Sequence, residues 1–175
     1  MGRIFLIGYM CAGKTTLGKA LAQALGMEFI DMDWCIEQRY HKTVRELFVE
    51  RGEDGFREVE QAMLHEVAEF ENVMIATGGG TPCFFDNMEY MNLKGTTVFL
   101  EVTEETLFNR LQAGKHTRPI LMNKTDEELR MFISSALSVR MPCYRKARYR
   151  FAADRLESRA QIEEAVKAFR EFLQI

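Results

Sequence analysis

Short apolar runs alternate along the chain with longer segments in which apolar residues recur at helical spacing. Short runs of this kind predict strands, at residues 3–7, 29–32, 73–76, 97–102 and 148–152. Apolar residues three and four positions apart predict helices, at residues 14–25, 55–70, 103–111, 126–138 and 156–173. The alternation of strands and helices favours an α/β fold with a mostly parallel sheet.

Local signals indicate where several of these elements begin and end. Gly26 follows the first helical segment directly and is placed to stop it. Thr43 and Glu46 match a capping box, so a helix should begin beside them, and Thr103 is placed to cap the helix that follows it. Residues 112–125 are polar and contain a glycine and a proline, which predicts a mobile excursion.

Length and composition narrow the classes of function. A chain of 175 residues suggests a single domain, 1–175. The formal net charge of -3 makes the chain a poor candidate for sequence-independent nucleic-acid binding, which neutralises many phosphates. A basic cluster at 140–150 is open to two interpretations, a solvated face or local anion site and, less favoured, a nucleic-acid patch.

The sequence gives no sign of a membrane segment or a zinc site. No apolar run is long enough to span a bilayer. The 4 cysteines have no C-x-x-C spacing, and the 3 histidines are scattered. A reduced, cytoplasmic protein is therefore the default expectation.

The most specific motif lies between the first predicted strand and the first predicted helix. Residues 8–15 read GYMCAGKT and match the phosphate-loop pattern GxxxxGK[ST] in full. Glycines in such a loop let backbone amides converge on phosphate oxygens, and the helix N-terminus adds a positive dipole end. Lys14 is then placed to reach the β- and γ-phosphates, and the Thr15 hydroxyl to bind Mg²⁺. The flanking strand and helix disfavour the alternative, a glycine-rich turn with a chance lysine.

Two carboxylates follow the second predicted strand. Ligands of open α/β sheets bind beyond the carboxyl ends of strands, which is where Asp31 and Asp33 lie. Alternation along a strand would put both side chains on one side, so that one could serve Mg²⁺ and the other orient an acceptor hydroxyl. The alternative is a solvated Asp31 followed by a helix N-cap at Asp33, and spacing alone does not choose between the two.

Further glycine and arginine positions suggest where an acceptor binds. Three glycines at 78–80 follow the third strand and suggest close approach of the backbone to a ligand, although a flexible turn also explains them. Arg57 and Arg140 are of a type that binds carboxylates in a bidentate manner, yet for either taken alone a surface arginine is the favoured interpretation. Arg118, in the polar excursion, is a candidate for closing over the phosphates.

Taken together, these motifs resemble the shikimate kinase family. The resemblance extends from about residue 2 to about residue 170, and it rests on residues 8–16, 31–33, 55–57, 78–80, 118–119 and 140–144. It implies a phosphate-loop kinase fold, with a five-stranded parallel sheet flanked by helices, a substrate-binding region at about 33–60 and a mobile lid at about 112–125. It also implies transfer of the ATP γ-phosphate to the 3-hydroxyl of shikimate, in the route to chorismate and the aromatic amino acids.

The same resemblance implies roles for individual residues. Asp33 would contact the shikimate hydroxyls, Thr15 and Asp31 would serve Mg²⁺, and Arg110 is a weaker match to a residue beside the adenine. The implied catalytic residues are Lys14, Asp33 and Arg118. The implied shikimate contacts are Asp33, Arg57, Gly78, Gly79, Gly80 and Arg140. The implied ATP contacts are Cys11, Ala12, Gly13, Lys14, Thr15, Thr16, Arg110 and Arg118.

The chain departs from the family pattern in two places. The family usually has glycine where this chain has Cys11, and a Cβ is uncomfortable there if the backbone adopts positive φ. Residues 154–155, on the adenine side, align poorly with the family and receive no assignment.

Two other functions stay open from the residues alone. One is a phosphate-loop kinase for another polar acceptor, such as gluconate or a nucleotide. The other is a nucleotide-binding module without catalysis, which the presence of Lys14, Asp33 and Arg118 argues against. We expect a cytoplasmic monomer that binds shikimate and ATP and has no nucleic-acid or membrane partner.

Overall fold

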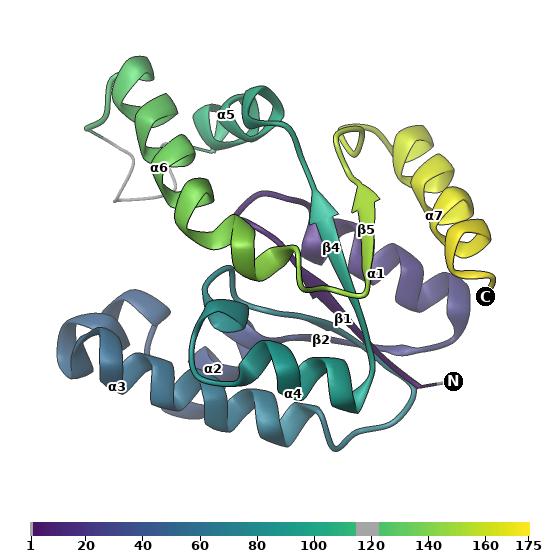
Figure 1. The fold of residues 1–175 in the computed structure, drawn as a ribbon, viewed down its shortest axis with the longest axis horizontal. Coiled ribbons are helices and arrows are strands. Elements are labelled where there is room, and N and C mark those ends of the chain that lie inside the picture. The colour runs from purple at the N-terminus through teal and green to yellow at the C-terminus, as the bar shows by residue number, and fades with distance from the viewer. Residues whose placement is uncertain (1, 115–122) are drawn as a thin grey trace.

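A parallel sheet lies at the centre of the computed structural model, which describes residues 2–114 and 123–175 (Figure 1). Its strands are β1 (Arg3–Ile7), β2 (Glu28–Asp31), β3 (Val73–Ala76), β4 (Thr96–Glu101) and β5 (Tyr149–Ala152). They pair in the order β2-β3-β1-β4-β5, and every pairing is parallel. The predicted five-stranded parallel sheet is confirmed, and the carboxyl ends of its strands meet along one edge.

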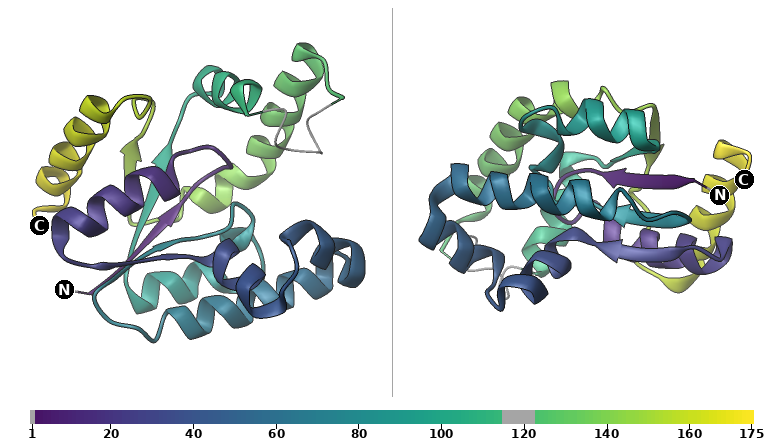
Figure 2. Two further views of the ribbon diagram at one scale, coloured as in Figure 1. Left: turned by 180° about the vertical axis from the view of Figure 1, so that it is seen from behind. Right: turned by 90° about the horizontal axis from the view of Figure 1, so that it is seen from below.

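Helices cover both faces of this sheet (Figures 1 and 2). Along β1, Leu6 and Phe5 belong to different apolar clusters because side chains alternate across a strand. Residues of α1 (Lys14–Leu25) and α7 (Arg159–Leu173) pack on the Leu6 face. Three further helices pack on the Phe5 face: α3 (Val44–Val67), α4 (Asn87–Lys94) and α6 (Asp126–Tyr144).

Three of the predicted helix starts and stops are confirmed in the structure. Gly26 ends α1 with a left-handed φ of 63°. Thr43 and Glu46 form the capping box that opens α3. The Thr103 side chain caps α5 (Glu104–Ala113). These signals work because each satisfies backbone groups that a helix end leaves without an intrahelical partner.

Some predicted boundaries were wrong. The helix predicted at 55–70 is the second half of α3, which kinks at Gly52, where φ is 70°. The helix predicted at 126–138 continues as α6 to Tyr144, although Pro142 lies in its last turn. Tyr144 is fully buried, and this packing outweighs the helix-breaking preference of the proline.

Two helices were missed from the sequence. α2 (Met32–Tyr40) and α4 are short, and each buries only two or three residues, so their apolar periodicity is weak. Met32, predicted as the last strand residue, is the first residue of α2. Among the described residues, no helix combines the length and apolar character that a membrane span requires.

The lid predicted at 112–125 lies mostly outside the described residues, and Arg118 lies outside them as well. Residues 112 and 113 belong to α5, so the helix runs further than predicted. Beyond the gap, Thr125 caps α6.

Candidate active site

The phosphate loop leaves the carboxyl end of β1 and opens α1. Gly8 and Gly13 adopt positive φ values of 156° and 98°, and Cys11 adopts 61°. A Cβ on Gly8 would lie 3.0 Å from the backbone oxygen of Leu100, which leaves little room for a side chain. The N-cap of α1 is Gly13, which has no side chain to cap the first amides, so these amides suit an anion. The loop therefore has the form of a phosphate cradle.

Lys14, the first residue of α1, folds its ammonium group back onto the loop. Its Nζ donates to the backbone oxygens of Gly8 at 2.7 Å and Tyr9 at 2.9 Å. Burial lowers the pKa of Lys14 to about 8, against the opposing charges of Asp33 and Asp31. The ammonium is still mostly charged at neutral pH, so a bound phosphate can draw it away from the two carbonyl groups.

Asp31 and Thr15 lie together on the side of the site predicted to serve Mg²⁺. Thr15 Oγ1 donates to Asp31 Oδ2 at 2.8 Å. Asp31 Oδ1 accepts from the backbone amide of Trp34 at 3.4 Å, which makes Asp31 the N-cap of α2. Both sequence interpretations were therefore wrong in detail: Asp31 and Asp33 do not alternate along a strand, and the cap is not Asp33. The chain turns into α2 immediately after Asp31.

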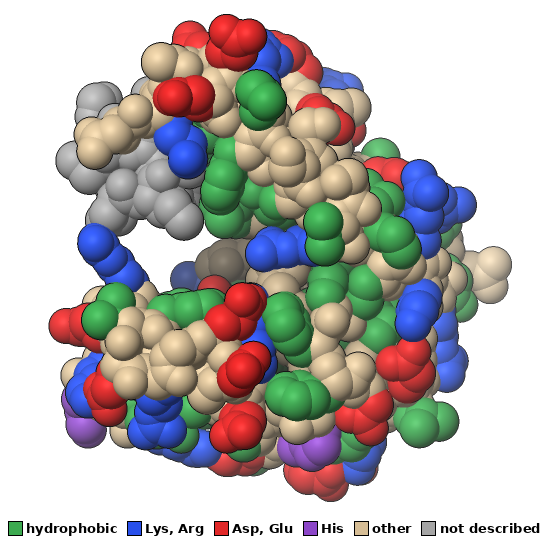
Figure 3. Space-filling view, turned by 60° about the vertical axis from the view of Figure 1, so that its left-hand side comes forward, with side chains coloured by type: hydrophobic (Ala, Val, Ile, Leu, Met, Phe, Trp, Pro, Cys, Tyr) green, Lys and Arg blue, Asp and Glu red, His purple; other side chains and the backbone are tan. Residues whose placement is uncertain are grey.

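Asp33 lies in the first turn of α2 and still faces the same cavity as Asp31. This cavity has a volume of about 540 Å³, and Lys14 and Thr15 also line it. The space-filling view shows a hollow in the surface, with basic, acidic and hydrophobic side chains along its edge (Figure 3). Burial raises the pKa of Asp33 to about 6, with the Lys14 charge opposing the shift and the Asp31 charge adding to it. Asp33 is therefore ionised at neutral pH and becomes protonated in mild acid.

Arg57 is a buried cation whose charge is already balanced. Its Nη1 donates to Glu60 Oε2 at 2.8 Å, and its Nη2 to Glu53 Oε1 at 3.2 Å. The guanidinium carbon also lies 4.0 Å from the ring centroid of Phe84. Glu60 is itself buried and accepts from Thr81 Oγ1 at 2.6 Å. Among the described residues, Arg57 Nε is buried and has no hydrogen-bond partner.

Arg140 is held differently, by aromatic residues. Its guanidinium carbon lies 5.5 Å from the ring centroid of Tyr9, a distance at which a cation and an aromatic ring attract each other. No carboxylate within the described ranges forms a salt bridge with it. Tyr144, on the same helix, donates from its hydroxyl to the Gly79 oxygen at 2.5 Å. Arg140 is thus the cation of the pair whose charge is not neutralised by a partner.

The glycines at 78–80 join these groups into one site. A Cβ on Gly78 would lie 3.1 Å from Asp33 Oδ1, and one on Gly79 would lie 3.3 Å from Arg140 Nη1. A Cβ on Gly80 would lie 2.5 Å from Arg57 Nη1. The glycine backbone therefore lies close to the two arginines and Asp33, and its predicted close approach to a ligand stays a prediction. The structure brings together both predicted arginines, the glycine run and the phosphate loop.

Comparison with known proteins decides the family. A sequence model of the family described as shikimate kinase matches residues 10–173 of this chain. The chain belongs to the shikimate kinase family. A shikimate kinase from Phocaeicola vulgatus is 62% identical over 173 residues, and the match covers 99% of each chain. The resemblance seen in the sequence is therefore confirmed over nearly the whole chain.

Solved structures agree with this membership. A crystal structure of shikimate kinase from Bacteroides thetaiotaomicron matches with a TM-score of 0.97 at 61% identity, covering 99% of each chain. A shikimate kinase from Acinetobacter baumannii in complex with shikimate matches with a TM-score of 0.82 at 33% identity, covering 99% of this chain and 94% of the other. A gluconokinase from Sinorhizobium meliloti is only 18% identical with a TM-score of 0.57, which shows the shared fold alone.

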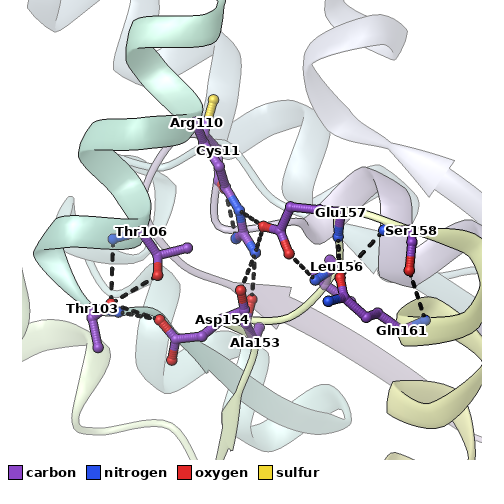
Figure 4. A network of polar contacts seen from close by, with 10 residues as sticks. All are labelled: Cys11, Thr103, Thr106, Arg110, Ala153, Asp154, Leu156, Glu157, Ser158 and Gln161. Atoms are coloured by element: carbon purple, nitrogen blue, oxygen red, sulfur yellow. Dashed lines mark hydrogen bonds and ion pairs between the residues drawn. The ribbon is translucent and has the colours of Figure 1, made fainter.

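Within this shikimate kinase fold, Arg110 on α5 occupies the edge of the cavity near the phosphate loop. Its guanidinium donates to the backbone oxygens of Cys11 at 3.2 Å, Ala153 at 2.9 Å and Asp154 at 2.9 Å (Figure 4). It also donates from Nε to Glu157 Oε1 at 2.9 Å. The donors of Arg110 contact the protein itself, and its expected place beside the adenine stays a prediction.

Several residues that contact the predicted site residues were not predicted from the sequence. Glu60 lies three positions after Arg57, and this spacing on a helix could have indicated the ion pair. No sequence signal connects Tyr9 with Arg140, because the contact joins residues 131 positions apart. Glu157 was missed because the segment between β5 and α7 has no recognisable motif.

Proposed function

We propose that this protein transfers the γ-phosphate of ATP to the 3-hydroxyl of shikimate, which gives shikimate 3-phosphate and ADP, in the route to chorismate and the aromatic amino acids. The family membership supports the reaction, and a relative has been solved in complex with shikimate. The observation that carries the proposal is a run of glycines, 78–80, that lies against the phosphate loop, the Asp33 carboxylate and the two arginines Arg57 and Arg140. Such a set suits an acceptor with both a hydroxyl and a carboxylate.

On the nucleotide side, the amides of residues 11–16 and the Lys14 ammonium would hold the phosphates. Lys14 would leave the carbonyl groups of its own loop and move to the β- and γ-oxygens, because a phosphate is a far stronger partner for an ammonium than a carbonyl group. Once the Lys14 ammonium has moved, the backbone oxygens of Gly8 and Tyr9 could accept hydrogen bonds from water instead. The ligand-bound loop would therefore differ from the free loop mainly in this side chain.

The residues present fit a magnesium ion. Thr15 Oγ1 and, through water, Asp31 would hold it, and both supply the hard oxygen atoms that Mg²⁺ prefers. Mg²⁺ keeps several waters and binds through few protein groups, which agrees with the absence of a cluster of three or more His, Cys, Asp or Glu among the described residues. When bound, it would neutralise charge on the β- and γ-phosphate oxygens.

On the acceptor side, Asp33 would orient the 3-hydroxyl and accept its proton. Its ionised state at neutral pH suits this role, and a pKa of about 6 makes it a stronger base than an ordinary aspartate. Arg57 and Arg140 would hold the carboxylate, with Arg140 supplying the positive charge that no salt bridge among the described residues balances. Gly78, Gly79 and Gly80 would let the acceptor approach the backbone closely.

The remaining parts of the proposal rest on the sequence and the family. Arg118, in a lid at about 112–125, would close over the phosphates and exclude water. Residues 33–60 would form the substrate-binding region of a single domain, 1–175. We also propose a cytoplasmic monomer with no nucleic-acid or membrane partner.

The direct test measures ADP release with shikimate, gluconate and nucleoside monophosphates as competing acceptors. We expect turnover with shikimate that exceeds turnover with any other acceptor by at least about a hundredfold, because the proposed site would hold a shikimate hydroxyl at Asp33 while its carboxylate reaches both arginines. Comparable turnover with gluconate or a nucleotide would reject the acceptor assignment and leave only the kinase class.

A further inference from the structure

Cys11 lies in a backbone conformation that its side chain disfavours. Its φ of 61° is in the left-handed region, where a Cβ approaches the backbone closely. This strained residue lies in the middle of the phosphate loop, whose amides must converge on one point to bind an anion. A relaxation of Cys11 to negative φ would rotate the peptide planes on either side of it and turn their amides away.

Arg110 holds the backbone oxygen of this strained residue. Its Nη1 donates to Cys11 O at 3.2 Å, and the side chain reaches the loop from α5, 99 residues further along the chain. The two bonds from Nη2, to Ala153 O and Asp154 O, are both 2.9 Å long and fix the guanidinium plane (Figure 4). Because the other donors of Arg110 are already bonded, its Nη1 has a fixed position and holds the Cys11 carbonyl group in place.

The anchor of Arg110 is itself fixed. Glu157 Oε1 accepts from Arg110 Nε at 2.9 Å, and Glu157 Oε2 accepts from the Leu156 amide at 2.8 Å. Asp154 Oδ1 accepts from the amide of Thr103 at 2.9 Å, next to the start of α5. The segment after β5 is therefore tied to the helix that carries Arg110, and the network has little freedom to follow a relaxing loop.

We infer that Arg110 is a positioning residue that holds Cys11 in its left-handed conformation and so keeps the phosphate loop in its nucleotide-binding form. Glu157 anchors Arg110 in this role. A glycine at position 11 would adopt positive φ without strain, whereas Cys11 is held there by this hydrogen-bond network. The inference rests on the proposed function only in taking the loop as the site of ATP phosphates.

A double-mutant cycle separates this role from direct contact with the nucleotide. If Arg110 acted only on the adenine, Arg110→Met would weaken nucleotide binding by the same factor whatever residue occupies position 11. If Arg110 acts through Cys11, the effect depends on that residue, because glycine adopts positive φ without strain. Arg110→Met keeps the apolar stem and removes every donor, so the cycle reports on the hydrogen bonds.

The experiment measures the dissociation constant of Mg²⁺–ADP by isothermal titration calorimetry for four full-length proteins: the unchanged chain, Arg110→Met, Cys11→Gly and the double variant. The left-handed conformation costs a residue other than glycine about 1–2 kcal/mol, which changes an equilibrium constant by about fivefold to thirtyfold. We expect Arg110→Met to weaken ADP binding by at least about five times more in the unchanged background than in the Cys11→Gly background. Equal factors in the two backgrounds, within about twofold, would overturn the inference.

Two further measurements keep the result interpretable. Thermal unfolding of all four proteins shows whether Arg110→Met folds; if it does not, Glu157→Gln replaces it in the same cycle, with the same expected dependence on position 11 and the same overturning result. Shikimate binding is measured alongside, and it should stay within about twofold in every variant. An unchanged chain that binds no ADP would refute the proposed function itself, which is a different outcome from equal factors in the cycle.

Discussion

The buried ion pair between Arg57 and Glu60 gives a stability prediction that can be worked out from the structure. The two side chains are 8% and 2% exposed, and 2.8 Å separates Arg57 Nη1 from Glu60 Oε2. Arg57→Met removes the cation and leaves the Glu60 carboxylate buried without its main partner. Breaking such a pair destabilises a protein by about 3–5 kcal/mol. For a chain of this size, that corresponds to a fall of about 6–20 °C in the melting temperature.

Equilibrium unfolding in urea, followed by circular dichroism, measures this effect. The double variant Arg57→Met with Glu60→Gln should recover most of the lost stability, because no buried charge remains uncompensated, while shikimate affinity stays low. Arg140→Met is the matched control, since Arg140 has no salt bridge among the described residues, and it should change stability by less than about 1 kcal/mol. If Arg57→Met unfolded like the control, the view that Glu60 relies on Arg57 for compensation would be refuted.

Three further predictions concern the reaction. Lys14→Ala should abolish phosphoryl transfer while circular dichroism and the unfolding midpoint stay close to normal, because Lys14 acts on ligand charge; near-normal turnover would reject the phosphate-loop assignment. Asp33→Asn should lower turnover strongly at any Mg²⁺ concentration, whereas Asp31→Asn should raise the Mg²⁺ requirement; rescue of Asp33→Asn alone by excess Mg²⁺ would exchange the two roles. Protonation removes the Asp33 base, so kcat/KM for shikimate should fall as pH drops through about 6. A pH profile that stays flat to about pH 5 would contradict this, and the residual activity of Asp33→Asn should not show the fall.

The parts of the molecule that the sequence predicted are those encoded by neighbouring residues. The phosphate loop, the capping box at Thr43 and the stop at Gly26 each depend on a few adjacent positions. The sequence also raised the question of positive φ at Cys11, and the structure answers it with a φ of 61°. The five-stranded parallel sheet was implied by the family resemblance, and the order of its strands came only from the structure, because local patterns do not fix which strands pair.

The parts that were missed depend on contacts between distant residues. Met32, the first residue of α2, was read as the end of a strand, and the helix cap was considered only at Asp33, because the short apolar run gives no local sign of where the strand stops. The contact of Arg140 with the ring of Tyr9 became visible only once the elements were packed, whereas the helical spacing of Arg57 and Glu60 could have indicated their ion pair. The link from Arg110 to Cys11 crosses 99 positions and leaves no trace in the sequence pattern.

The most direct test of the central claim identifies the product of the reaction. The protein is incubated with ATP, Mg²⁺ and shikimate, and the product is examined by two-dimensional phosphorus–proton nuclear magnetic resonance. We predict one new phosphate monoester whose phosphorus couples to the proton on carbon 3 of the ring, formed in equal amount with ADP. ADP without a phosphorylated acceptor, or phosphorus coupled to the proton of a different carbinol carbon, would contradict the account.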